Sequence, residues 1–244
     1  MSKQPAAQEQ HPTHEQRPAH EQRRSAARQA LAAVLAAAAA GEFPPANGRV
    51  EVLAQPSDRE AGVISLTGYS AIFADTDPDW VTAQLPAGDL SGPLTASFLH
   101  ALSQRLSRRT HSIDMLTCAA PLPGRPAPDL DLTELSAGGG AAHPRIVRAL
   151  HYRDDVRAWR APGGVLMLGR GVAGRLEVAI EVDPARRGRG LGSRLATAAR
   201  HLVPGGQPLW AQIAPGNAAS VRAFLAAGFR PVGAEALLSR DLPE

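Results

Sequence analysis

The sequence predicts an α/β protein whose sheet is mixed, largely antiparallel and flanked by helices. Two observations carry this prediction. Three strand candidates follow one another at tight spacing with glycines between them, which is typical of an antiparallel meander; they are "DVRAWRA" (155–161), "GVLMLG" (164–169) and "RLEVAIEV" (175–182). After the meander, helix and strand patterns alternate as far as residue 238, as they do in α/β folds.

The N-terminal region is expected to lie outside the main fold. Residues 1–24 are polar and lack the apolar residues that a core requires, so we expect a disordered tail. Because alanine is the best helix former, the alanine-rich run within residues 25–47 predicts a helix ending at Gly41, followed by a linker. An export signal is the alternative interpretation, but the polar stretch ahead of the run argues against it. The run is too short to span a bilayer, so we expect no membrane association and a cytoplasmic protein.

Residues 48–122 are expected to form a smaller N-terminal α/β unit. Its predicted elements are strands within 49–56 and 62–75, an amphipathic helix within 92–109 and a strand at 112–119. The proline-rich "PLPGRPAPD" (121–129) is a stiff connector, and the main unit covers residues 128–244. The role of the smaller unit is open between a wall of the substrate site and an oligomer interface, so a homodimer is one possibility.

Composition restricts the classes of function. Lys and Arg number 26 against 23 Asp and Glu, and the net charge of +3 is too small to make the whole protein a nucleic-acid binder by electrostatics. The single cysteine, Cys118, excludes an internal disulfide and is consistent with a reducing compartment. It lies within an apolar run, so we expect it to pack in the core. The tail histidines have no scaffold of further ligands, so we expect no metal.

The most informative stretch is "EVDPARRGRGLGSRL", residues 181–195. Pro184 ends a strand because proline donates no hydrogen bond to a sheet, and the glycines that follow let the backbone turn tightly and approach a ligand closely. The next residues begin a helix, whose first amides and positive dipole end face the loop. A strand that leads through glycines into a helix N-terminus is an anion site, and a pyrophosphate matches it in size.

Other uses of this loop fit less well. A Rossmann loop requires a third glycine where this chain has Ser193, and a Walker loop requires a Gly-Lys pair that the chain lacks. Nucleic-acid binding would call for stacking aromatics among the arginines, and none interleave here. A flexible basic linker would not explain why a strand and a helix adjoin the loop.

Two motifs resemble those of the GNAT superfamily of acyl-CoA-dependent N-acyltransferases. The first is the spacing Arg187-x-x-Gly190-x-Gly192, and the second is "LWAQIAPGNAASVRAFLAAGFRPVG" (209–233), in which Asn217 and Ser220 precede a helix and Gly228-Phe229 opens the next strand. The resemblance covers the chain from about residue 130 onward. It implies a GNAT-like sheet in this half of the chain.

The resemblance also implies acetyl-CoA as co-substrate and a set of residues that contact it. The amides of the loop would hold the pyrophosphate, and the strand before it would splay from the next one so that the pantetheine arm lies between them. The implied contacts are Arg187, Gly188, Arg189, Gly190, Leu191 and Gly192 in the loop, Ile180 and Val182 on the strand, and Asn217. Asn217 is equally well explained as a helix N-cap, and the two roles are compatible.

The implied catalytic residues depart from the family pattern. Many members have a tyrosine that protonates the departing thiolate, and Phe224 stands at that position, with a ring that donates no proton. Many also have a carboxylate that deprotonates the amine, and the candidates here are Glu177 and Glu181. Neither falls on the expected register, which a β-bulge would restore. Both glutamates could instead form ion pairs with arginines of the meander, among them Arg175.

The predicted function is acyl-CoA-dependent N-acetyltransfer to an amine by direct attack. The acceptor is a small-molecule or peptide amine whose identity the sequence does not give. Because Phe224 replaces the family's proton donor, a second function remains open: an acyl-CoA-binding regulatory or partner-binding module on a catalytically weakened GNAT fold.

Overall fold

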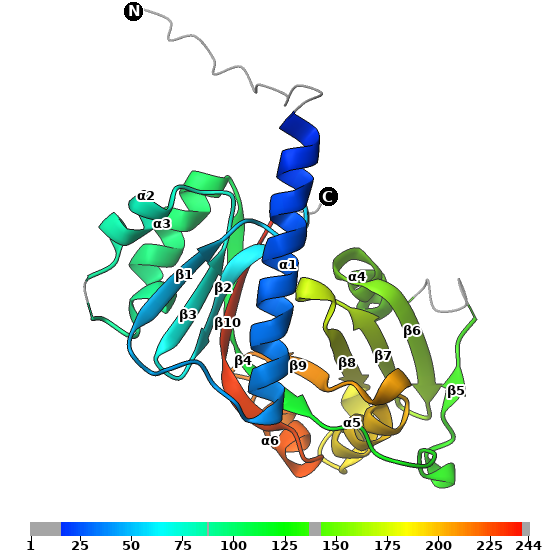
Figure 1. Ribbon diagram of the computed structural model, residues 1–244. Coiled ribbons are helices and arrows are strands. Elements are labelled where there is room, and N and C mark those ends of the chain that lie inside the picture. Colours follow the sequence, from blue (N-terminus) through cyan, green and yellow to red (C-terminus); the bar gives the residue numbers. More distant parts are fainter. Residues whose placement is uncertain (1–15, 87, 137–142, 241–244) are drawn as a thin grey trace, which may run out of the picture.

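The protein is described by a computed structural model that covers residues 16–86, 88–136 and 143–240. Ten strands form one sheet in the order β1-β3-β2-β10-β4-β9-β8-β7-β6-β5 (Figure 1). The strands are β1 (Arg49–Leu53), β2 (Ala61–Leu66), β3 (Tyr69–Phe73), β4 (Arg109–Ala119), β5 (Thr133–Glu134), β6 (Asp154–Ala161), β7 (Gly164–Arg170), β8 (Leu176–Val182), β9 (Leu209–Ile213) and β10 (Arg230–Ser239). The predicted mixed, largely antiparallel sheet is confirmed.

Helices cover both faces of the sheet. They are α1 (Gln16–Ala40), α2 (Pro78–Gln84), α3 (Ala96–Leu106), α4 (Pro144–Tyr152), α5 (Leu191–His201) and α6 (Ala218–Ala226). On one face, α1 packs over β2, β3 and β4, and α4 packs over β6, β7 and β8. On the other face, α2 and α3 cover β2, β3 and β10, while α5 and α6 cover β7, β8 and β9.

The meander forms as its glycine-punctuated pattern predicts. β6 pairs antiparallel with β7, and β7 pairs antiparallel with β8. The register of β7 on β8 runs without a shift from Arg170 opposite Leu176 to Gly164 opposite Val182. The β-bulge that would have moved a glutamate into the family register is therefore absent from this pairing, which is a correction to that expectation.

The smaller unit and the main unit contribute strands to the same sheet. β4, from residues 48–122, lies between β9 and β10, and both pairings are antiparallel. β10 pairs on its other side with β2, also from the smaller unit. Strands that are consecutive in the main unit are thus separated by a strand from the smaller one, and the two sets of residues form one continuous hydrogen-bonded layer.

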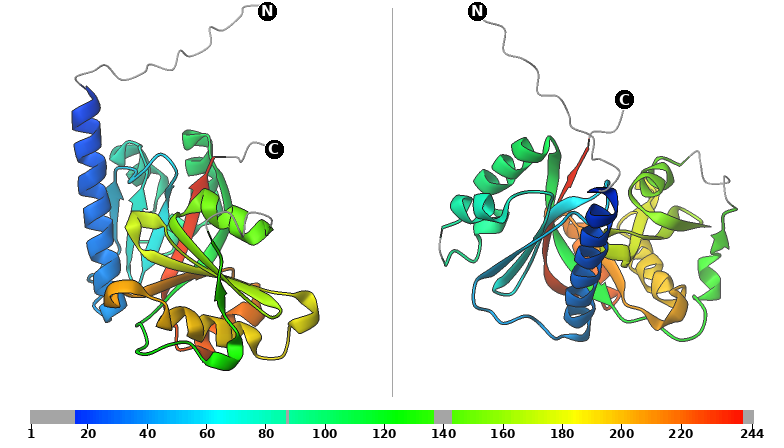
Figure 2. Two further views of the ribbon diagram at one scale, coloured as in Figure 1. Left: turned by 90° about the vertical axis from the view of Figure 1, so that its right-hand side faces the viewer. Right: turned by 45° about the horizontal axis from the view of Figure 1, so that its top comes forward.

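The helix α1 begins earlier than predicted. It starts at Gln16, within the residues 1–24 expected to be a tail, and it ends at Ala40, directly before Gly41 as predicted. Residues 1–15 lie outside the described part of the chain. Figures 1 and 2 show α1 alongside the strands, with its N-terminal part extending beyond the sheet. Within the described residues, no helix is long and apolar enough to cross a membrane.

The buried side of α1 is a short apolar stripe. Ala27, Leu31, Leu35 and Ala38 recur every three or four residues and are buried against the sheet, close to Cys118. Cys118 is buried as expected, and burial raises the pKa of its thiol, so it acts as a packing residue.

Replacing Leu31 by alanine is expected to destabilise the protein. The side chain is fully buried, and a Leu→Ala change in a core removes apolar burial and leaves a cavity, at a cost of about 3 kcal/mol. Leu90→Ala is the matched control, since that leucine is 57% exposed and its loss is expected to cost less than about 0.5 kcal/mol. Urea unfolding of the three proteins measures both values; equal costs would show that α1 is not docked as described.

Candidate functional site

The site begins where β8 and β9 separate. These two strands are parallel and are registered over only two residue pairs, Leu176 with Leu209 and Glu177 with Trp210. Beyond Glu177, β8 continues to Val182 and β9 to Ile213 without pairing to each other. The separation that the family resemblance implied is therefore present, and it leaves backbone groups on the facing edges of both strands free for another partner.

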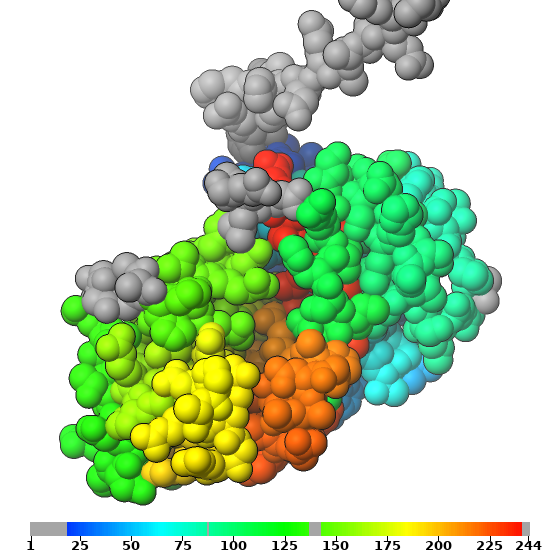
Figure 3. Space-filling view, turned by 180° about the vertical axis from the view of Figure 1, so that it is seen from behind, coloured from blue at the N-terminus to red at the C-terminus, as the bar shows by residue number. Residues whose placement is uncertain are grey.

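A cavity of about 340 Å³ occupies this region. Its apolar part lies between the separated strands and α6, where Ile180, Ile213 and Phe224 line it together with Asn217. In the space-filling view, a hollow runs between the yellow surface of the β8–α5 segment and the orange surface of the β9–α6 segment (Figure 3). The volume of the cavity is in the range of small-ligand pockets.

The glycine loop lies at the end of β8. Gly188 and Gly190 have φ of +73° and +80°, a region that side-chain-bearing residues rarely adopt. Gly190 is the N-cap of α5, and among the described residues no side chain caps this helix. The first amides of α5 are therefore available to a ligand, as expected of an anion site. Added Cβ atoms at Gly188 or Gly190 would meet nothing within 4 Å, so the loop faces open space.

The other residues expected to contact the co-substrate surround this opening. Ile180 lines the cavity, and the carbonyl of Val182 accepts a hydrogen bond from Nε of Arg187 at 3.0 Å, which fixes the start of the loop against the strand. Asn217 also lines the cavity, and its Oδ1 accepts a hydrogen bond from the amide of Ser220 at 3.1 Å. The N-cap role of Asn217 is thus confirmed, and its contact with pantetheine remains a prediction.

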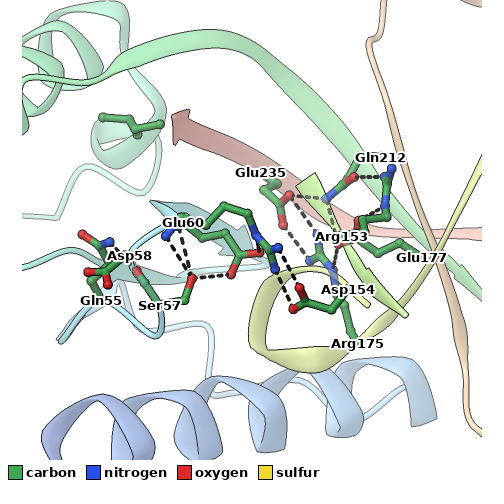
Figure 4. Close-up of polar contacts among 12 residues, drawn as sticks. Gln55, Ser57, Asp58, Glu60, Arg153, Asp154, Arg175, Glu177, Gln212 and Glu235 are labelled. Carbon is green, nitrogen blue, oxygen red and sulfur yellow. Dashed lines mark hydrogen bonds and ion pairs between the residues drawn. The ribbon is translucent and has the colours of Figure 1, made fainter. Parts of the chain in front are cut away.

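Glu177 is held in a buried network of charged and polar side chains (Figure 4). Arg175 donates through Nε to Glu177 Oε1 at 2.8 Å and through Nη2 to Glu235 Oε1 at 2.9 Å. Arg153 donates through Nε to Glu177 Oε2 at 2.8 Å. Gln212 donates through Nε2 to Oε1 of both carboxylates, at 3.1 and 2.7 Å. The ion pair with Arg175, one of the alternatives open from the sequence, is therefore present.

The network gives its two carboxylates opposite pKa shifts. Burial alone would raise the pKa of Glu177, but the charges of Arg175 and Arg153 outweigh it and hold that pKa below its usual range. Burial raises the pKa of Glu235 despite Arg175, and the nearby charge of Glu177 adds to the rise. A carboxylate with a lowered pKa is a weak proton acceptor, so Glu177 is better suited to shaping the cavity wall than to removing a proton.

Glu181 and Phe224 occupy different positions relative to the cavity. Glu181 lies two residues beyond Ala179 on the strand face covered by α4, and it is not among the residues that line the cavity. Phe224 is buried at the cavity wall and packs edge-on against Phe229 with ring centroids 4.9 Å apart. At this position the chain offers an apolar ring where a proton donor was expected from the family.

Much of the polar cavity wall escaped the sequence analysis. The smaller unit contributes Glu60, next to the start of β2, and His111, Ser112 and Asp114 of β4. Helix α4 contributes Arg145 and Arg148, and Arg153 directly follows that helix. The residues of the smaller unit reach the cavity because β4 lies between β9 and β10 and β2 pairs with β10, and no local pattern signals that arrangement. Their position favours the first of the two roles left open for the smaller unit, a wall of the site.

Glu60 differs from Glu177 in its electrostatic surroundings. Burial raises its pKa, although Arg59 opposes the rise, and the charge of Glu177 adds to it. Nε of Arg59 donates to Glu60 Oε1 at 3.2 Å, while both terminal nitrogens of Arg59 bind the carboxylate of Asp154 at 3.0 Å. Arg59 therefore shares its charge with an exposed partner, and Glu60 keeps a raised pKa.

Glu177→Gln is expected to destabilise the protein by about 3 kcal/mol at neutral pH, since removing one partner of a buried ion pair leaves charge uncompensated. Because the native pKa of Glu177 is lowered, its contribution is present above the ordinary glutamate pKa of about 4.3 and is lost as the pH falls through the native value. Unfolding by urea at several pH values measures this. Glu134→Gln is the control: its pair with Arg157 is exposed, so the change is expected to cost less than about 1 kcal/mol.

One family model and several solved structures are similar to part of this chain. The model of the FR47-like protein family matches residues 169–237, which span β8, the glycine loop and β9. No curated protein matches the chain. Among solved structures, a GCN5-related N-acetyltransferase from Kribbella flavida is 22% identical, with 59% of this chain and 64% of that chain covered and a TM-score of 0.40. The match thus spans less than two thirds of that protein.

Two other solved structures are similar at lower identity. A putative acetyltransferase from the GNAT family of Novosphingobium aromaticivorans is 18% identical over 55% of this chain and 68% of that one, with a TM-score of 0.37. A tandem GNAT protein from the clavulanic acid biosynthesis pathway is 15% identical over 76% of this chain and 64% of that one, with a TM-score of 0.39. In residues 169–237, which contain the glycine loop and the separated strands, the chain is thus similar to the FR47-like protein family.

Proposed function

We propose that the protein is an acyl-CoA-dependent N-acyltransferase that transfers an acetyl or similar acyl group to an amine. The observation that carries the proposal is the separation of β8 from β9 beside a glycine loop that opens α5. This arrangement offers free strand edges to an amide-containing arm and a helix N-terminus to a pyrophosphate. Acetyl-CoA has both groups in one molecule, and it fits the site as a co-substrate.

In this proposal, the loop and the strand edge divide the binding of the co-substrate. The amides of residues 187–192 hold the pyrophosphate, and Arg187 and Arg189 add positive charge beside it. The pantetheine arm lies between β8 and β9, near Ile180, Val182 and Asn217. The thioester then reaches the part of the cavity lined by Phe224, whose apolar ring supports packing of the acyl group.

The proposed reaction is a direct transfer. The amine nitrogen attacks the thioester carbonyl carbon, the new C–N bond forms and the C–S bond breaks, and the sulfur leaves with the bonding pair. The attacking amine must lose a proton to a base, and the leaving thiolate takes a proton from water, since Phe224 has none to give. Because a thiol has a pKa of about 8.5, the leaving thiolate needs no strong acid for this protonation near neutral pH.

Among the glutamates of the cavity wall that could remove the proton, we favour Glu60, because its pKa is raised whereas that of Glu177 is lowered. Glu177 and Glu181 were the sequence candidates, and their catalytic roles remain predictions. Glu177 lines the cavity, but two arginines hold it as a weak base, and Glu181 does not line the cavity. Glu60 lines the same cavity, and its raised pKa makes it the stronger proton acceptor. We therefore assign proton removal to Glu60 and a positioning role to Glu177.

The competing function is an acyl-CoA-binding module without turnover, favoured by one observation, the phenylalanine in place of the family's proton donor. The two functions share the binding site and differ in chemistry. Thiol release from acetyl-CoA in the presence of an amine panel separates them. Turnover supports the transferase, while binding without turnover supports the module.

Gly190→Val is expected to abolish stabilisation by CoA. A side chain at this αL position disturbs the backbone that would contact the pyrophosphate, whereas native protein gains stability from a ligand that binds only the folded state. Gly205→Val is the matched control, because Gly205 also has positive φ and open surroundings but lies outside the loop. The measurement is the shift in Tm with millimolar CoA. A native protein that shows no shift would contradict the acyltransferase proposal.

Glu60→Gln is expected to lower kcat/KM by about 100-fold or more and to remove the rise of activity with pH that a titrating base produces. The rise is expected because a base with a raised pKa becomes active as it loses its proton. Glu134→Gln is the control, since Glu134 is an exposed carboxylate that pairs with Arg157 and does not line the cavity. Rates of thiol release from pH 5 to 9 provide the measurement. If Glu60→Gln keeps the native pH profile and Glu177→Gln loses it, Glu177 is the base.

A further inference from the structure

Among the described residues, two arginines of α4 face the cavity and have no carboxylate partner. Arg145 and Arg148 are three residues apart, so they lie on one side of the helix, and both line the cavity. Within the described residues, neither forms an ion pair or a hydrogen bond from its guanidinium group. The Cζ atom of Arg148 lies 5.3 Å from the centroid of the Tyr152 ring. This separates them from Arg59 and Arg153, whose guanidinium groups bind carboxylates.

The guanidinium of Arg145 is the less solvated of the two. Its Nε is buried and has no hydrogen-bond partner in the described structure. Burial lowers its pKa, and the neighbouring charges of Arg153 and Arg148 lower it further. A buried donor without an acceptor and a set of like charges are both unfavourable, so the free protein retains an electrostatic cost at this wall.

An anion in the cavity would relieve this cost. Charge-assisted hydrogen bonds from arginine to a carboxylate or phosphate are among the strongest that proteins form, and the guanidinium fork suits both groups. Residues 137–142, which come before α4 in the sequence, are all alanine or glycine and so have no acidic side chain. Within the described residues, Glu181 is the acid whose charge acts on Arg145, and the two do not form an ion pair.

We propose that Arg145 and Arg148 form an anion subsite for the acceptor, so that the amine substrate carries a carboxylate or phosphate group. This inference rests on the proposed function and specifies its substrate class. The acceptor's anionic group lies against α4, and its amine points toward the separated strands. A cavity of about 340 Å³ suits a small amino acid or the end of a peptide.

The proposed site for the phosphates of the co-substrate is separate from the two arginines of α4. The glycine loop opens α5, and α5 packs on the face of the sheet that carries Leu168 and Val178. Helix α4 packs on the opposite face, against Met167 and Ala179. The two arginines and the phosphate loop therefore belong to helices on opposite faces of the sheet, and a variant of one can be tested for its effect on the other.

The test compares matched amines in the full chain. The probes are 4-aminobutanoate against 4-aminobutanamide and glycylglycine against glycylglycinamide, with 2-aminoethylphosphonate to distinguish phosphate-like from carboxylate acceptors. Thiol release from acetyl-CoA gives kcat/KM for each, and calorimetric titration of the same compounds into CoA-saturated protein gives affinities without turnover. The variants are Arg145→Gln and Arg148→Gln. Arg23→Gln is the control, because Arg23 is exposed on α1 away from the cavity.

The expected result is that native protein prefers each anionic probe over its neutral partner by about tenfold or more, as a charge-assisted hydrogen bond supports. Each α4 variant is expected to remove most of this preference, chiefly through KM, while keeping the native Tm shift with CoA. Equal use of both members of a pair, or a preference that survives in both variants, would overturn the subsite and leave the transferase proposal standing. If the protein shows no turnover, the titration tests the subsite by itself. Equal affinities for the anionic probe and its neutral partner would then overturn the subsite.

Discussion

The structure depends on a buried network of charged side chains that holds the sheet together at the point where β8 and β9 separate. β8 and β9 share only two residue pairs, and at the second of these Glu177 enters a buried network with Arg175, Glu235 and Gln212. The network links β8, β9 and β10 by side chains at the level where backbone pairing between β8 and β9 ends. Arg153, which directly follows α4, joins it and fixes the end of that helix. The ion pairs and hydrogen bonds of this network hold its elements in one arrangement around the open cavity.

The same network explains why the carboxylates of the cavity are unequal. Two arginines keep Glu177 ionised, while Glu235 and Glu60 lie in surroundings that favour their protonated forms. Residues that differ in this way can divide positioning from proton transfer within a small volume. Elsewhere on the cavity wall, Arg145 and Arg148 have no such counter-charges among the described residues. The cavity is therefore polarised, with compensated charge near the separated strands and uncompensated positive charge on α4.

The sequence contains the local features of this site but not its long-range ones. Gly188 and Gly190 were expected to let the loop turn, and both have positive φ. The meander and the start of α5 were also predictable, because their signals lie within a few residues. Helix α2 was missed although Asp77 and Pro78 are a typical cap and first residue. The contribution of Glu60 could not be predicted, since it depends on β4 lying between β9 and β10. Hydrophobic periodicity predicts that a segment is a strand, but it does not predict which other strands that segment pairs with.

The position of β10 has a consequence for how the chain acquires its shape as it is made. β2, β3 and β4 leave the ribosome long before β10, yet β2 and β4 are both neighbours of that last strand. Until residues 230–239 emerge, one edge of β2 and one edge of β4 have no partner strand. Glu235 of β10 is also missing from the buried network at the cavity until then. Closure over such sequence separations is slow and leaves strand edges exposed in the meantime. The ten-stranded sheet is therefore complete only once residues 230–239 have emerged and β10 can pair with both β2 and β4.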